Sequence, residues 1–594
     1  MPDIQTNTTA NAHTSYRACT LCEAACGLEI EHNEHEVLRI KGHAADPVSR
    51  GHICPKAVAL QDLHTDPDRL RQPVKKVNGE WQAIGWQQAF DEIGSRMASL
   101  QKAHGNDAVG AYIGNPNAHS HGNVLFALPL LKAIDSRNRY SAGSVDQLPL
   151  YVALIKMFGH FGCLPVADLD RTDFMICLGG NPMASNGSIM AAPDMRKRLG
   201  DIAKRGKLVV IDPRRTETAK VANQHLFIRP NGDAELLAAM IHILFRDGLA
   251  NAGSLVSLVD GESILRNAVE NFTPERAEKA SGIAASDIEK LVADFCAAKS
   301  PVLYSRIGAC TQENGSLSQF LVLAFNLLTG RIDATGGMMF TTPAVDLATL
   351  GRLSGETSHY GRYRNPATGL PETAGELPVS AMADEILGDH PERLRALYVL
   401  AGNPASSAPN SPRMNAAMEK LELLVCQDYY ISETSRHADY ILPPTSPLER
   451  DCYPLITNIV GIRNSANYSE ALFTPANDAK HDWEIMLGLR QALLKAGAGR
   501  RLDKVRVDAE HLALSKLGPD GMLETLIRGG PHGLRKGRKG LSLKKLKQHQ
   551  GTFDLGALEE GRLPGQLATV DKRIKLAPAE FIAELKRLGS QSVD

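Results

Sequence analysis

Cysteine is scarce in this chain, with ten residues among 594. So few thiols in so long a chain do not build the disulfide framework of a small secreted domain. Neither sign of charge is in excess, because 66 lysines and arginines face 67 aspartates and glutamates. The total charge therefore indicates neither nucleic acid nor an anionic membrane as a partner. Long apolar runs are also missing: none approaches the roughly 20 residues of a membrane-spanning helix, so we expect no membrane span.

The first twenty residues lack the basic, apolar and small-residue zones of a secretory signal, and they contain no pair of adjacent arginines. We therefore expect a cytoplasmic protein. A chain of 594 residues is too long for one hydrophobic core. We expect about two to four domains.

Four of the ten cysteines have a spacing that predicts a metal centre. Cys19, Cys22, Cys26 and Cys54 form the pattern C-x2-C-x3-C-x27-C. Four thiolates bind either a structural zinc ion or a 4Fe-4S cluster. Zinc ribbons usually pair two C-x2-C units, whereas three thiols on one loop and one distant thiol suit the corners of an iron–sulfur cube. The spacing favours the cluster and leaves zinc as the alternative.

The rest of the chain alternates short apolar runs with amphipathic segments, which is typical of parallel α/β layers. Four apolar runs end in Gly, Asn, Pro or Asp, namely "FMICLGGNP", "KLVVIDPRR", "ALYVLAGNP" and "LLVCQDYY". Ligands of open parallel sheets bind beyond the carboxyl ends of the strands. We therefore expect the functional residues in these polar turns.

Two of these turns form an internal repeat. Residues 176–186, "ICLGGNPMASN", resemble residues 398–408, "YVLAGNPASSA", and each segment precedes a second strand that ends in an acid, Asp212 or Asp428. Glu-Thr follows each acid at the same offset. An acid at a strand end suits the ribose or base of a nucleotide, and the backbone amides of the Gly-Asn-Pro turns suit its phosphates. Ordinary turn chemistry is the alternative for one turn, but the duplication favours two similar nucleotide ligands.

The cluster loop and the repeated turns together resemble the molybdopterin oxidoreductases of the dimethyl-sulfoxide-reductase type, which include formate dehydrogenases and nitrate reductases. The resemblance runs from about residue 15 to the end of the chain. It implies an α/β fold with a small N-terminal iron–sulfur subdomain and two pseudo-symmetric parallel-sheet domains whose chain segments interleave. It also implies one 4Fe-4S cluster and a molybdenum ion, or tungsten, held by two pyranopterin guanine dinucleotides (bis-molybdopterin guanine dinucleotide).

The resemblance suggests four parts in the chain. We expect a cluster subdomain at 14–72, a discontinuous domain with the second dinucleotide site at 73–140 and 341–480, a domain with the first site at 141–340, and a helical segment and linker at 481–594. Family members usually continue into a C-terminal domain that covers both dinucleotides. We expect this cap to be absent from the chain, through truncation, supply by a separate chain, or loss.

The resemblance also suggests site residues, position by position. The cluster ligands would be Cys19, Cys22, Cys26 and Cys54. Lys56 matches a lysine between cluster and pterin, although a surface lysine is the alternative. Arg306 and Gly308 match the loop near the metal centre. The first dinucleotide would contact Asn181, Ser185, Asn186, Asp212, Arg214 and Thr216. The second would contact Asn403, Ser406, Asp428, Thr434 and Asp439.

The protein ligand of the metal is predicted in the segment "RYSAGSVDQLPLY", which contains no cysteine. Asp146 is the first choice, because a carboxylate is a hard donor suited to a high-valent metal. Ser144 is the second choice, and helix capping is the alternative role for Asp146. Formate dehydrogenases of the family carry cysteine or selenocysteine followed by histidine here. The departure weakens a formate assignment and favours oxygen-atom transfer.

The resemblance implies a two-electron oxidoreductase that acts on a small-molecule substrate. Electrons would pass singly through a pterin and the cluster to a redox partner, which could be a ferredoxin, a flavoprotein or a partner subunit. Three alternatives stay open: a formate dehydrogenase-like subunit, a non-redox hydratase with the same cofactors, and a cofactor-free scaffold derived from the family. The basic segment "GLRKGRKGLSLKKLKQHQ" reads either as a solvated loop or as a docking surface for an acidic redox partner.

Overall fold

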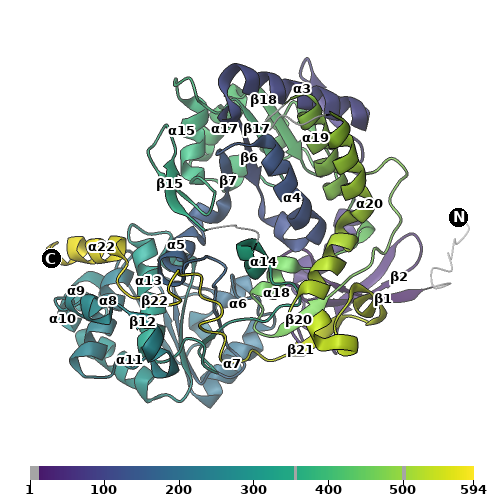
Figure 1. Ribbon diagram of the computed structural model, residues 1–594. Coiled ribbons are helices and arrows are strands. Elements are labelled where there is room, and N and C mark those ends of the chain that lie inside the picture. The colour runs from purple at the N-terminus through teal and green to yellow at the C-terminus, as the bar shows by residue number, and fades with distance from the viewer. Residues whose placement is uncertain (1–11, 354–357, 498–503, 594) are drawn as a thin grey trace, which may run out of the picture.

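The computed structural model describes residues 12–353, 358–497 and 504–593. Two α/β lobes lie one above the other in Figure 1, and a small β-subdomain at the N-terminus lies beside them. This subdomain is an antiparallel sheet in the order β1-β2-β3. Its strands are β1 (His13–Ala18), β2 (Gly27–His32) and β3 (Val37–Gly42).

The lower lobe of Figure 1 is built on a parallel sheet in the order β11-β10-β9-β13. Two of its strands, at residues 174–178 and 301–305, are buried along their whole length, because helices cover both faces of the sheet. All five residues of β9 are apolar, as expected for a strand without a solvent face. The strands are β9 (Phe174–Leu178), β10 (Lys207–Ile211), β11 (Gln224–Leu226) and β13 (Pro301–Ser305).

The upper lobe contains a seven-stranded sheet in the order β5-β4-β19-β18-β17-β6-β7. Its strands are β4 (Val74–Val77), β5 (Glu80–Ala83), β6 (Val109–Ile113), β7 (Arg139–Ser141), β17 (Ala396–Leu400), β18 (Leu423–Gln427) and β19 (Tyr440–Ile441). The chain forms strands β4 to β7 first, then builds the lower lobe, and returns to the upper lobe to form β17 to β19. The expected interleaving of the two lobes is confirmed.

The two sheets repeat one arrangement. The order β11-β10-β9-β13 of the lower lobe matches β19-β18-β17-β6 of the upper lobe, and all these pairs are parallel. Leu178, at the end of β9, pairs with Ser305 of β13, and Leu400, at the end of β17, pairs with Ile113 of β6. The polar turns after the matched strands therefore occupy equivalent positions at the carboxyl edges of the two sheets.

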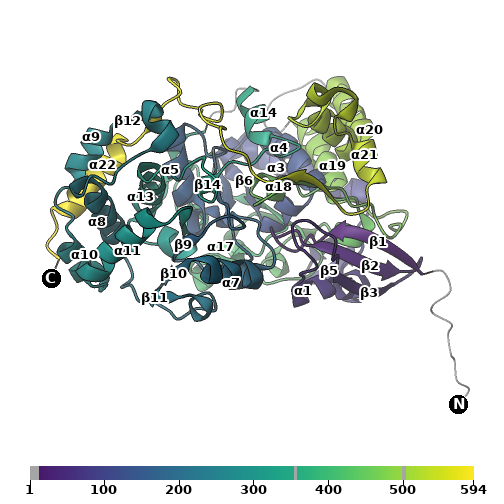
Figure 2. The same ribbon diagram turned by 90° about the horizontal axis from the view of Figure 1, so that it is seen from below.

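The segment expected as a helical linker at 481–594 is divided between the lobes. Helix α19 (Asp482–Lys495) packs on α3 (Trp86–His104) and α4 (His121–Ile134), and its apolar residues join the core of the upper lobe. The end of the chain joins the lower lobe, where α22 (Ala579–Gly589) stacks Phe581 on Phe320. Figure 2 shows α22 against the lower lobe, at the opposite end of the molecule from β1–β3.

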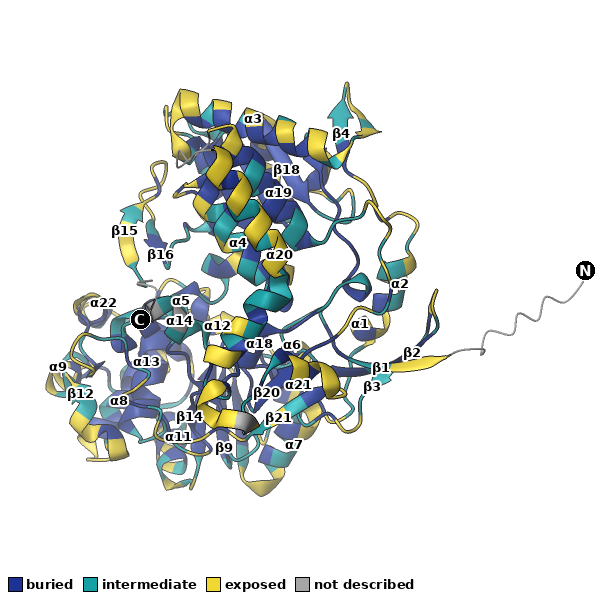
Figure 3. Ribbon diagram, turned by 45° about the vertical axis from the view of Figure 1, so that its right-hand side comes forward, coloured by how far each residue is buried: buried dark blue, intermediate teal, exposed yellow. Residues whose placement is uncertain are grey.

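Burial follows the layers. In Figure 3 the strands β9 and β18 are buried, whereas the outer faces of α3 and α20 (Lys504–Gly529) are exposed. Over the residues that the structure describes, no helix combines the length and the apolar character that crossing a membrane requires.

Candidate functional site

The four predicted cluster cysteines lie together beside the sheet β1–β3. The N–H of Cys19 donates to the carbonyl oxygen of Cys26 over 2.8 Å, which closes the loop that carries the first three thiols. Cys54 directly precedes the short helix α1 (Pro55–Val58). Burial raises the pKa of the Cys26 thiol, and the neighbouring thiols of Cys19, Cys22 and Cys54 raise it further.

These thiols are free to bind metal. None of the four is in a disulfide. Burial raises the pKa of Cys19 to about 12, so the thiolate needs a nearby cation before it can form at neutral pH. Bound metal supplies that charge and displaces the proton. Within the described ranges, no group of three His, Cys, Asp or Glu side chains is positioned around a single ion.

Lys56 and Glu23 flank the cysteine loop. Lys56 is exposed, and its ammonium group lies near enough to Cys22 to lower the pKa of that thiol, whose largest shift is a rise caused by burial. Glu23, which sequence reasoning missed, follows Cys22 directly and accepts a hydrogen bond from the N–H of Ile189 over 3.1 Å. Burial raises the pKa of the Glu23 carboxyl, and the guanidinium of Arg306 partly offsets the rise. Glu23 thus connects the cysteine loop to the lower lobe.

Arg306 and Asp146 meet between the lobes. Arg306 directly follows β13, and Asp146 ends the short 3-10 helix η3 (Ala142–Val145) that follows β7. Nη2 of Arg306 donates to Oδ1 of Asp146 over 2.6 Å. Nε and Nη2 of Arg306 also donate to Oγ of Ser188 over 3.0 and 2.6 Å. The structure therefore brings together two predicted site residues that are 160 positions apart in the chain.

Ser188 belongs to a strained backbone segment. Asn186, Gly187, Ser188 and Ile189 all have positive φ angles, of 56°, 119°, 63° and 48°. A β-branched residue such as Ile189 rarely adopts this conformation, which costs about 1–3 kcal/mol. The hydroxyl of Tyr304 donates to the Gly187 carbonyl, and the Arg306 and Glu23 contacts hold the segment from the other side. Strained segments of this kind cluster at functional sites.

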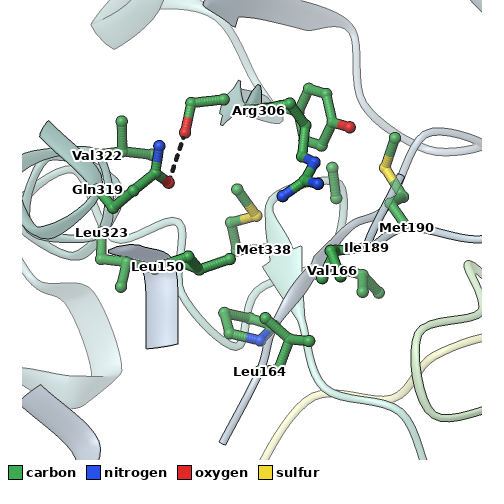
Figure 4. A pocket seen from close by; sticks show the side chains of 14 residues that line it. Leu150, Leu164, Val166, Ile189, Met190, Arg306, Gln319, Val322, Leu323 and Met338 are labelled. Carbon is green, nitrogen blue, oxygen red and sulfur yellow. Dashed lines mark hydrogen bonds between the residues drawn. The ribbon is translucent and has the colours of Figure 1, made fainter. Parts of the chain in front are cut away.

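One face of Arg306 borders a small apolar cavity. Figure 4 shows its guanidinium group between Met338 on one side and Ile189 and Met190 on the other. The cavity has a volume of about 30 Å³, and Leu150, Leu164 and Val166 complete much of its wall. Nη1 of Arg306 is buried, and it has no hydrogen-bond partner among the described residues. This orphaned donor can bind an anionic or carbonyl oxygen, because a buried unpaired N–H costs free energy.

Ser144, the second choice for the metal ligand, is engaged elsewhere. Its Oγ accepts a hydrogen bond from the N–H of Val379 over 2.9 Å. Asp146, in contrast, contacts Arg306. The structure thus brings Asp146, and not Ser144, into the group around Arg306.

The repeated turns have the same hydrogen-bond pattern in both lobes. In the lower lobe, Oδ1 of Asn181 accepts from Oγ1 of Thr218 over 2.8 Å, and Nδ2 donates to Glu217 over 2.7 Å. The matching bonds of Asn403 in the upper lobe, to Thr434 and Glu433, measure 2.7 and 2.6 Å. Each threonine hydroxyl also accepts from the residue two positions after the asparagine. The repeat inferred from the sequence is confirmed at the level of individual atoms.

The two strand-end acids also match. Oδ1 of Asp212 accepts from the N–H two residues later, and so does Oδ1 of Asp428. Burial is the largest cause of a raised pKa at both carboxyls. Thr216 caps the turn through its hydroxyl, which accepts from Ala219 over 3.0 Å, so it shapes the turn from inside.

The exposed members of the predicted set lie around these turns. Ser185 donates to the Asn181 carbonyl. Ser407, not Ser406, makes the matching bond to Asn403 in the upper lobe. Asn186 has left-handed backbone angles at the end of its turn, and Arg214 is exposed beside Glu217. The N–H of Gly308 donates to the Gly179 carbonyl over 2.9 Å, so the Arg306 loop contacts the first turn directly.

Asp439 is the exception in the predicted set. Its carboxylate accepts from the N–H of Leu424, near the start of β18, whereas Asp428 follows the end of that strand. At about 3.3 Å per residue, the two acids are separated by about 13 Å along the strand. Asn223 makes the matching bond to Leu208 in the lower lobe, so this position supports the sheet in both lobes. The structure does not bring Asp439 to the group of site residues.

Comparison with known proteins identifies the family. Residues 69–491 match the family model "Molybdopterin oxidoreductase", and residues 13–63 match "Molybdopterin oxidoreductase Fe4S4 domain". The chain is 26% identical to the assimilatory nitrate reductase catalytic subunit of Bacillus subtilis over 81% of its length and 68% of that protein. It is 25% identical to the thiosulfate reductase molybdopterin-containing subunit of Salmonella typhimurium, over 80% of this chain and 63% of that one.

A solved structure supports the fold. Acetylene hydratase from Pelobacter acetylenicus aligns with a TM-score of 0.77 at 19% identity, over 96% of this chain and 78% of that one. The Fe4S4 domain match covers the segment with the four cysteines and supports a 4Fe-4S cluster over zinc, and the molybdopterin match spans most of both lobes. The chain belongs to the molybdopterin oxidoreductase family, an enzyme family whose members with this Fe4S4 domain carry a molybdopterin cofactor with molybdenum and a 4Fe-4S cluster.

Proposed function

We propose that this chain carries the catalytic centre of an oxygen-atom-transfer reductase, in which two pyranopterin guanine dinucleotides hold one molybdenum or tungsten ion between the lobes. The observation that carries the proposal is the pairing of Asp146 with Arg306 between two lobes whose turn systems match bond for bond. Matched turns support two copies of one ligand, and the paired carboxylate supports a hard donor for the metal.

The two dinucleotides would each lie against one sheet edge. Asp212 and Asp428 end matched strands, where an acid can accept hydrogen bonds from a ribose or a guanine ring. Asn181 and Asn403 hold their turns rigid through paired side chains, so contacts to the ligands would come from the turn backbone and from Ser185, Asn186, Arg214 and Ser407. Thr216 and Thr434 would support these turns from inside.

Asp146 would be the protein ligand of the metal. Its carboxylate keeps one oxygen on Arg306, and this guanidinium holds the side chain in one orientation. The bound cofactor would supply two-electron chemistry at the metal. The residues of this chain would bind and orient the substrate: Nη1 of Arg306 can donate to a substrate oxygen, and the apolar wall beside it excludes water.

Electrons would reach this centre through the cluster subdomain. Lys56 lies beside Cys22, where its positive charge can offset the negative charge of a reduced cluster and bind a pterin ring. We propose a soluble redox protein as the electron donor and a cytoplasmic location for the reaction.

Metal analysis and an acceptor screen test this proposal. Anaerobically purified protein should contain iron and molybdenum or tungsten, and should show the broad visible absorption of an iron–sulfur cluster. With reduced viologen as donor, it should reduce nitrate, selenate, arsenate or a sulfoxide. Oxidation of formate with oxidised viologen as the electron acceptor, or turnover of an unsaturated substrate without any electron donor, would contradict the oxygen-transfer assignment. Protein without either metal would favour the scaffold alternative.

A further inference from the structure

One surface segment of the chain is strongly basic. Between Glu524 and Asp554 the sequence contains eight lysines and arginines and no acidic residue, in a chain whose formal net charge is -1. The segment forms the end of α20, a 3-10 turn η9 (Leu534–Lys539) and the short helix α21 (Leu543–Gln548). The excess charge of the segment is therefore local and is balanced elsewhere in the molecule.

Several of these cations are available to a partner. Arg535, Lys536, Lys539 and Lys544 are exposed, and within the described part of the chain they form no ion pair. The neighbouring Lys547 differs, because its ammonium group lies 2.8 Å from a carboxylate oxygen of Asp520. Unpaired exposed cations in one patch create a field that steers an oppositely charged protein toward it.

The basic patch is tied to the cluster subdomain. Thr552, which follows α21, donates its hydroxyl hydrogen to the carboxylate of Asp46. Asp46 also accepts from Ser49, and the Ser49 hydroxyl accepts from the N–H of Gly27, the residue after Cys26. Figures 2 and 3 both show α21 beside the sheet β1–β3. The segment that carries the free cations is therefore attached to the cluster subdomain.

We propose that Arg535, Lys536, Lys539 and Lys544 form a docking surface for a small acidic electron-carrier protein. This inference rests on the proposed function and specifies where its electron donor binds. Each reduced carrier would give up one electron to the cluster and leave oxidised, and two such transfers supply the electron pair that reduces one substrate molecule. Position and charge both favour this occupant, because a carrier must approach the cluster and its acidic surface complements the patch.

A nucleic acid is the other polyanion that such a patch could attract. Residues 525–552 contain no Phe, Trp or Tyr, so the patch lacks the aromatic side chains on which single-stranded bases stack. Its attachment to the cluster subdomain, in contrast, suits a protein that delivers electrons to a cluster. The observations therefore favour the electron carrier, and nucleic acid becomes an outcome of the test.

The test compares two fourfold charge reversals of the full chain. The first variant carries Arg535→Glu, Lys536→Glu, Lys539→Glu and Lys544→Glu. The matched control carries Lys102→Glu, Lys279→Glu, Lys299→Glu and Lys586→Glu. These are exposed lysines without ion pairs among the described residues, and they lie on α3, α10 (Pro274–Ser281), the loop before β13 and α22. Both variants change the net charge equally, so overall charge cannot explain a difference between them.

Binding of a purified acidic ferredoxin is measured by titration calorimetry at low and high salt, and turnover is measured with ferredoxin and with reduced viologen as donors. The patch variant should bind ferredoxin at least about ten-fold more weakly, lose a similar factor in kcat/KM with ferredoxin, and keep its viologen activity. The control should stay within about two-fold of the wild type in all three measurements, because its reversed charges lie away from the proposed surface.

Equal ferredoxin binding by the two variants would overturn the proposal. So would tighter binding of wild-type protein to a DNA duplex or to anionic vesicles than to ferredoxin. The binding measurement needs no turnover. If the wild type reduces none of the acceptors with viologen as donor, this result contradicts the proposed function alone. If the two variants bind ferredoxin equally, this result contradicts the docking surface alone.

Discussion

The two lobes share one arrangement of strands and turns but differ in the residue that follows one matched strand. In both, an asparagine after a buried strand binds a threonine and a glutamate from the next turn, with bond lengths that agree within about 0.1 Å. The strands on the other side differ, because Arg306 follows β13 whereas Gly114 follows the matched strand β6. Under the proposed function, the duplicated turns would bind the cofactor, and the arginine that follows one strand would take part in the reaction.

The difference at this strand end is enforced by packing. A side chain at Gly114 would place its Cβ 1.7 Å from the carbonyl oxygen of Ala401, so the upper lobe cannot carry an arginine there. In the lower lobe, the chain leaves β13 as extended backbone at Arg306 and turns into α12 (Ile307–Cys310). The guanidinium can therefore extend to Asp146 and Ser188.

Substitution of Arg306 should change kcat/KM more than substitution next to the matched position of the upper lobe. Arg306→Gln removes the charge that binds Asp146 and the orphaned donor beside it, and we expect kcat/KM to fall by about 100-fold or more. Asn115→Ala, next to the matched position of the upper lobe, should change kcat/KM by less than about three-fold. Steady-state kinetics with viologen as donor measures both. Equal losses would break the proposed division between the duplicated turns and the arginine that takes part in the reaction.

The two asparagines should be equivalent. Asn181→Ala and Asn403→Ala each remove three hydrogen bonds and leave a fully buried threonine hydroxyl with fewer partners. We expect each substitution to lower the free energy of unfolding by about 3 kcal/mol and to reduce the guanine nucleotide content of purified protein. Urea unfolding and nucleotide analysis after acid hydrolysis check this. A loss in only one variant would show that one turn binds no dinucleotide.

Asp233 introduces a pH-dependent asymmetry in the lower lobe. Burial raises its pKa to about 6, with Asp212 contributing a further rise and Gln312 opposing it. The folded chain then binds the proton more tightly than the unfolded chain, so stability falls as the pH rises from about 4 to about 6 and stays low above that. Asp233→Asn should therefore stabilise the protein by about 2 kcal/mol at pH 8 and have no effect at pH 3.5. Thermal unfolding of both proteins across this pH range measures the difference, and a constant difference would contradict the assignment.

The smallest effect concerns one backbone position that the lobes fill differently. Gly179 in the lower lobe and Ala401 in the upper lobe have positive φ angles of 57° and 49°. Ala401→Gly should raise the unfolding free energy by no more than about 1 kcal/mol, because the relief of strain exceeds the entropy cost. Gly179→Ala should destabilise the protein by more, since its Cβ would lie 2.6 Å from the backbone nitrogen of Ala309. Chemical unfolding measures both variants. Equal changes in the unfolding free energy for Ala401→Gly and Gly179→Ala would contradict the predicted difference between the two turns.

Much of the fold could be predicted from the sequence, because its signals are local. The cysteine spacing, the apolar strands and the Gly-Asn-Pro turns each lie within a few residues, and the offset between each acid and its Glu-Thr pair exposed the repeat. Pairing of Asp146 with Arg306 depends on two segments that meet only in the folded chain. No local pattern predicts that these two residues lie together, and only the family resemblance places both of them near the metal.

Other site residues could not be predicted, for physical reasons. The family resemblance predicts that Asp439, like Asp428, contacts the second dinucleotide, but which end of a strand a residue occupies depends on the register of the sheet. The sequence marks Glu23 only by its position after Cys22, and Ser188 only by its position in the first turn motif. Their contacts form when the cluster loop packs on the lower lobe, so no local pattern predicts them. Ser407 and Ser406 are adjacent, and only the helical turn decides which hydroxyl reaches Asn403.

The ratio of guanine nucleotide to metal tests the central claim most directly. Protein purified without oxygen is denatured in acid, released guanine nucleotide is quantified by chromatography, and molybdenum, tungsten and iron are measured in the same sample. We predict two guanine nucleotides for each molybdenum or tungsten ion, together with about four iron atoms. One nucleotide per metal ion, or zinc in place of iron, would contradict the claim that two matched turns hold one metal centre beside an iron–sulfur cluster.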